Sequence, residues 1–69
     1  MKLTWHYLSS KHADLYDEDK GVRVGLVHES LNGDCVAMAL QSDGVWQTLL
    51  DKLPFIKAKH LVETVARLS

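Results

Sequence analysis

A chain of 69 residues, 46% of them hydrophobic and 25% charged, is the size of one folded domain and is too apolar to be disordered. Its net charge of −1 argues against a protein whose main task is to hold nucleic acid by its phosphates. Cys35 is the only cysteine, so no disulfide can form within the chain. A domain this small has a small core and needs another source of stability, and we therefore expect it to form a homodimer.

The beginning of the chain does not have the pattern of a secretion signal. Trp5, His6 and Tyr7 stand where such a signal needs an unbroken apolar stretch. No other segment approaches the roughly 20 consecutive apolar residues of a membrane span. A single free cysteine without an export signal favours the cytoplasm.

The first segment predicts a strand, and the second predicts a loop. In residues 2–9, Leu3, Trp5 and Tyr7 alternate with more polar neighbours, as in a half-buried strand. Residues 10–21 are polar and acidic, so we expect a loop there, with at most a single helical turn near Ala13.

Two apolar runs in the middle of the chain predict a β-hairpin. Residues 22–30 and 35–41 flank Asn32 and Gly33, and Asn-Gly is typical of a two-residue type I′ turn. The pairs that this turn predicts are Glu29–Val36, Val27–Met38 and Gly25–Leu40 on one face, and Ser30–Cys35, His28–Ala37 and Leu26–Ala39 on the other. A bulge or a longer turn would change these pairs.

This hairpin is apolar on both faces. The face with Ala37 and Ala39 has small side chains that allow a helix or a second sheet to approach closely. The short chain has too few residues to cover both faces, so we expect one face to meet another chain.

The last third of the chain predicts two helices. Residues 45–53 follow a capping segment at residues 42–44 and have Trp46, Leu49, Leu50 and Leu53 at helical spacing. Pro54 ends this helix and can begin the next, at residues 55–69. The predicted fold is therefore a single α+β domain over residues 1–69, with a small antiparallel sheet of one N-terminal strand and a hairpin, then a short helix and a longer one.

The sequence predicts no catalytic residue, metal site or cofactor. Cys35 lies beside the predicted turn without an evident base, and His28 lies on a strand with apolar neighbours. The four histidines lack the paired spacing of zinc ligands.

Two groups of residues are candidates for binding a partner protein. The first group is acidic and consists of Asp14, Asp17, Glu18 and Asp19. It is either a solvated loop or a docking surface in which carboxylates take the place of DNA phosphates on a basic protein. The second group is Ile56, an isoleucine on the polar side of the last helix, together with His60 and Arg67.

A helix-turn-helix that binds DNA is the alternative for the two predicted helices. However, the connection between them is a proline and not the usual turn with glycine. A small DNA-binding regulator or antitoxin therefore ranks second to a protein that binds proteins.

From MKLTWHYLSS through YDEDKGVRVGLVHES to HLVETVARLS, the chain resembles the small quorum-sensing anti-activators of Pseudomonas temperate phages. The resemblance is one of length, composition and general character over all 69 residues, without a diagnostic motif. It implies a protein that acts in the host cell, where it binds and inhibits a LuxR-type quorum-sensing activator (LasR) and the PilB-type ATPase that assembles type IV pili. It assigns no role to a particular residue.

Overall fold

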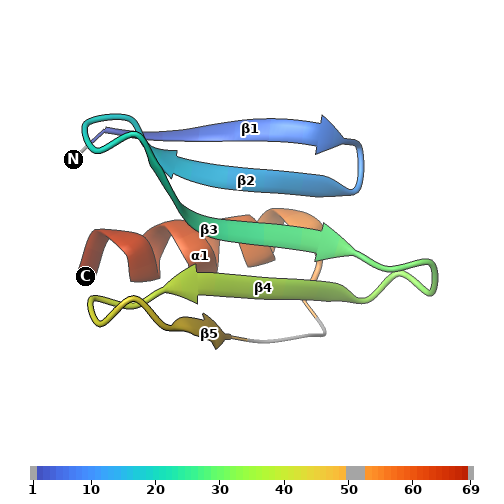
Figure 1. Ribbon diagram of the computed structural model, residues 1–69. Helices are drawn as coiled ribbons and strands as arrows, with labels where there is room; N and C mark the ends of the chain where they lie inside the picture. Colours follow the sequence, from blue (N-terminus) through green and yellow to red (C-terminus); the bar gives the residue numbers. More distant parts are fainter. Residues whose placement is uncertain (1, 50–52, 69) are drawn as a thin grey trace.

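The computed structural model describes residues 2–49 and 53–68. One antiparallel sheet has its strands in chain order: β1 (Leu3–Ser9), β2 (His12–Asp17), β3 (Val22–Glu29), β4 (Cys35–Leu40) and β5 (Trp46–Thr48). The helix α1 (Phe55–Leu68) packs against β3 and β4 on one face of this sheet (Figure 1). The α+β class is confirmed, and these described ranges contain five strands and one helix in place of the predicted three strands and two helices.

The predicted loop at residues 10–21 is wrong, because it contains β2, which pairs with both β1 and β3. Ala13 and Leu15 are fully buried towards α1, while Asp14 alternates with them on the opposite face. The loop was predicted because the segment contains charged residues such as Asp14 and Asp17, which usually lie in solvent. Both carboxylates are nevertheless buried, and each has partners within the fold.

The predicted hairpin is confirmed, but its register is wrong by one residue. Glu29 pairs with Cys35 and Val27 with Ala37, because the loop has three residues and not two. The amide of Gly33 donates to the carbonyl of Ser30, and only Gly33 of the loop has a positive φ, at 90°. A type I turn followed by a left-handed glycine explains the extra residue.

The predicted helix at residues 45–53 is wrong. Gly44, with φ of 87°, turns the chain back, and the amide of Gln41 donates to the carbonyl of Val45 over 2.9 Å. Trp46 therefore lies opposite Leu40 as the first residue of β5. Leu50, a member of the predicted helical stripe, lies outside the described residues, as does the rest of segment 50–52. Without this helix, the described residues contain no helix-turn-helix.

The core lies between α1 and the sheet, on the face whose small side chains were expected to allow a helix or a second sheet to approach closely. Ala37 and Ala39 face α1, where Ala58 and Val62 are buried against them. The helix comes close to the strand at Gly25, where a Cβ atom would lie 2.3 Å from Cγ1 of Val62. The last helix was correctly predicted from residue 55 onwards.

Candidate functional site

The face of the sheet opposite α1 is open: no described helix or strand packs on it (Figure 1). A group of apolar side chains lies on its β3, β4 and β5, and we call it the open-face patch: Leu26, Val36, Met38, Leu40 and Trp46. Each of these side chains is only half-buried. Leu26 pairs directly with Met38, and Leu40 pairs with Trp46, so the patch is continuous across three strands.

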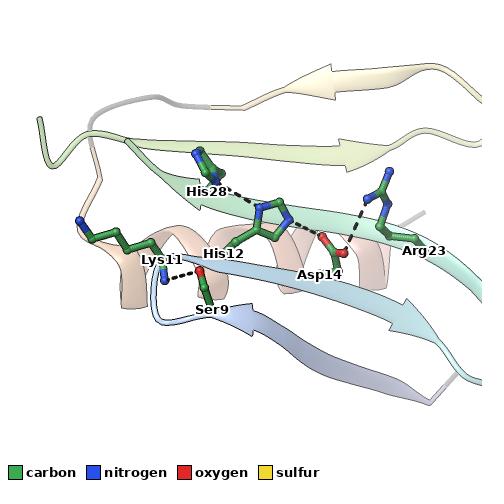
Figure 2. Close-up of polar contacts among 6 residues, drawn as sticks. All are labelled: Ser9, Lys11, His12, Asp14, Arg23 and His28. Carbon is green, nitrogen blue, oxygen red and sulfur yellow. Dashed lines mark hydrogen bonds and ion pairs between the residues drawn. The ribbon is translucent and has the colours of Figure 1, made fainter. Parts of the chain in front are cut away.

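A chain of polar contacts, the histidine network, runs beside this patch across β2 and β3 (Figure 2). Nδ1 of His12 lies 3.1 Å from Nδ1 of His28, and Nε2 of His12 lies 2.9 Å from Oδ1 of Asp14. Arg23 approaches the other oxygen of Asp14 at 3.6 Å. Asp14 is only 4% exposed, and a carboxylate so deeply buried requires partners of this kind.

An irregularity in the sheet brings Arg23 into the network. The register between β2 and β3 shifts after Leu15, so that Tyr16 pairs with Arg23. A bulge of this kind redirects the side chains that follow it. The guanidinium of Arg23 also lies 5.2 Å from the centre of the Trp46 ring, which connects the network to the open-face patch.

The contacts of the histidine network are with other ring, carboxylate and guanidinium groups. Asp14 orients His12, and within residues 2–49 and 53–68 no serine or cysteine is hydrogen-bonded to either ring. The described residues contain no cluster of three or more histidine, cysteine or acidic side chains that could enclose a metal ion. Cys35 is fully buried on the opposite face, where burial, with Glu29 and Asp34 adding to it, raises the pKa of its thiol.

The structure separates the four predicted acidic residues. Asp14 and Asp17 are buried and lie on opposite faces of β2. Oδ1 of Asp17 accepts a 3.0 Å hydrogen bond from the amide of Asp19, which holds the β2–β3 turn. Only Glu18 and Asp19 of the four are exposed to a partner.

The predicted helix surface is likewise only partly assembled. Ile56 is 81% exposed and lines a shallow groove with Trp5, Lys59, His60 and Glu63. We call this the helix groove. Within the groove, the ammonium of Lys59 lies 5.2 Å from the centre of the Trp5 ring.

Arg67 does not belong to this groove. It follows Ile56 by eleven residues, or roughly 16 Å along the helix axis. It lies at the end of α1 that is near the β2–β3 turn (Figure 1). At this end, Ala66 and Lys20 line a second hollow of about 310 Å³.

The sequence did not indicate the histidine network. His12 and His28 are 16 residues apart and meet only because β2 pairs with β3. A signal for that hairpin is present in the sequence: Asp17 begins the turn and Gly21 ends it with a φ of 67°.

Comparisons with protein-family models, curated proteins and solved structures find no match for this chain. Among the described residues, no helix has the length and apolar character needed to cross a membrane.

Proposed function

We propose that this chain is a non-enzymatic protein that acts by binding other proteins, and that it does so as a homodimer joined through the open-face patch. The observation that carries the proposal is the continuous patch of half-buried apolar side chains on β3, β4 and β5. An antiparallel sheet that faces water usually presents polar side chains there, and a contiguous apolar surface is typical of an interface.

A second copy is the occupant that best fits this patch. Interfaces of permanent homodimers are more apolar than those of transient complexes. A two-fold axis would place the same patch on both sides, so that each copy covers the other. A dimer would add to a small core, because the buried side chains of α1 are small or β-branched: Ala58, Val62 and Ala66.

The dimer would leave a separate surface for a target protein. The open-face patch lies opposite α1, so the outer side of the helix, with Ile56 and His60, stays accessible. The resemblance described above implies the targets: a LuxR-type quorum-sensing activator and a type IV pilus ATPase. The exposed carboxylates of Glu18 and Asp19 suit a basic surface on such a regulator.

Mass measurement of a patch variant tests the dimer. Sedimentation of the wild-type chain at micromolar concentration should give twice the mass of one chain. Met38→Lys places a charge in the centre of the patch, where burial without a partner is unfavourable, and should give a folded monomer.

Leu31→Lys is the matched control. Leu31 is an apolar residue that is 99% exposed in the β3–β4 loop, outside the patch, so its replacement should leave the dimer intact. A monomeric wild-type chain, or a Met38→Lys variant that still dimerises with full affinity, would contradict the proposed interface.

A further inference from the structure

The two histidines of the network face each other across β2 and β3. His12 and His28 are direct partners in the register, with ring centres 5.2 Å apart and ring planes inclined by 64°. Their Nδ1 atoms are 3.1 Å apart on the open face (Figure 2). His28 is exposed, so an ion in the solvent can reach this pair.

Asp14 sets the protonation of His12. An ionised carboxylate only accepts hydrogen bonds, so neutral His12 must carry its proton on Nε2, which donates to Oδ1 of Asp14 over 2.9 Å. Nδ1 of His12 then carries a lone pair on the side of His28, 3.1 Å from Nδ1 of that ring. Histidines that bind metals are typically held in this way, with the other ring nitrogen donating to a carboxylate.

We propose that His12 and His28 form a cross-strand chelate for a divalent transition metal such as zinc, bound through both Nδ1 atoms. Zinc lies about 2.0–2.1 Å from an imidazole nitrogen, so two nitrogens 3.1 Å apart would subtend an angle of about 100° at the ion, near the tetrahedral value. Imidazole χ2 rotations are soft, so small ring movements suffice to direct both lone pairs at one ion.

Binding requires one proton to move. In the metal-free pair, His28 donates its Nδ1 proton to His12, since Nδ1 of neutral His12 can only accept. On binding, this proton leaves Nδ1 of His28 and the exposed ring takes one from water on Nε2, so no net proton is lost. Water fills the remaining positions of the ion, and no electron is transferred.

Among the described residues, the cysteine and the other two histidines lie away from this pair. Cys35 is buried on the opposite face with its thiol held protonated by a raised pKa. Nε2 of His6 lies 3.0 Å from Glu18, and His60 lies on α1 in the helix groove. Both ligands come from one chain, so the chelate needs no second copy. His28 pairs with Val36 of the open-face patch, so the chelate lies at the edge of the proposed dimer interface.

Zinc titration of the full chain without a histidine tag tests the proposal. Calorimetry should detect zinc binding, and NMR should show the ring signals of His12 and His28 shifting together. Replacement of the exposed His28 in His28→Gln should weaken binding at least about tenfold, and His12→Gln should do the same. Either one zinc per chain or one zinc per two chains would support the chelate.

His60→Gln is the matched control and should bind zinc as the wild type does. Asp14→Asn, with folding checked by circular dichroism, should weaken binding about 10–100-fold through the orientation of His12. Absence of zinc binding at millimolar zinc, or equal loss in His60→Gln and His28→Gln, would overturn the proposal. If His12→Gln fails to fold, His28→Gln decides, because its side chain lies in solvent.

Discussion

At the scale of single residues, the position of Cys35 in the fold determines the reactivity of its thiol. It is fully buried between β4 and α1, and loss of hydration raises its pKa, with a further contribution from the negative charges of Glu29 and Asp34. The thiol therefore stays protonated and shielded in the native state, which makes it a poor nucleophile.

Cys35 should react with a thiol reagent much more slowly in the native chain than in the denatured chain. Its raised pKa also predicts a pH effect. The folded state keeps its proton above pH 9, where the unfolded thiol ionises, so stability should fall as pH rises above about 9. Chemical denaturation at pH 8 and pH 10 measures this loss.

Cys35→Ala is the control for this pH effect. The variant should lose about 1 kcal/mol of stability through weaker packing, and the part of the pH dependence due to the thiol should disappear. Rapid labelling of the native wild-type chain at the rate of the denatured chain would contradict the burial of Cys35.

At the scale of elements, the contact between α1 and β3 depends on Gly25. The helix crosses the strand so closely that a Cβ atom on residue 25 would lie 2.3 Å from Cγ1 of Val62. Val62 is fully buried and β-branched, so its side chain has little freedom to move aside.

Gly25→Ala should therefore destabilise the fold by about 1–3 kcal/mol, the usual cost of overpacking, as measured by urea denaturation. In a Val62→Ala background Cγ1 is absent, and the same change at residue 25 should cost much less. The difference between the two losses of stability measures the interaction between residues 25 and 62. Equal costs in both backgrounds would mean that the helix does not approach β3 at this point.

At the scale of the whole molecule, the two predicted binding surfaces lie apart. Ile56 and His60 lie in the helix groove near the beginning of α1, whereas Glu18 and Asp19 form the β2–β3 turn near its end. Both surfaces remain exposed when the open-face patch is covered. A target could therefore bind either surface of a dimer, and variants can separate the two.

The proposed binding to a LuxR-type activator should depend mainly on the helix groove. Ile56→Asp should weaken binding at least about tenfold, because a desolvated apolar anchor generally contributes more than exposed charges. A Glu18→Lys, Asp19→Lys double variant should mainly slow association and reduce its dependence on salt.

Leu68→Asp, which replaces another exposed apolar residue of α1, is the control and should bind normally. Surface plasmon resonance at two salt concentrations measures the association and dissociation rates of each variant. Unchanged binding in both the Ile56→Asp variant and the double variant would exclude both surfaces.

Local patterns in the sequence determined much of this fold. The alternation around Trp5, the two apolar runs beside Gly33 and the amphipathic segment after Pro54 predicted β1, β3, β4 and α1. The small residues of β4 also indicated a face that a helix or a second sheet could approach closely, and α1 covers this face. These elements follow from side-chain spacing and turn residues within a few positions of the chain, which is why they could be read without the structure.

Tertiary contacts decided the rest. The sequence of β2 is typical of a loop, but a buried carboxylate is tolerated when it has partners, and Asp14 has His12 of its own strand and Arg23 of β3. The spacing of Trp46 and Leu49 suits a helix, but the turn at Gly44 and the unpaired edge of β4 made the segment a strand. The pairing of β2 with β3 likewise brought His12 to His28, since groups 16 residues apart meet only through long-range register.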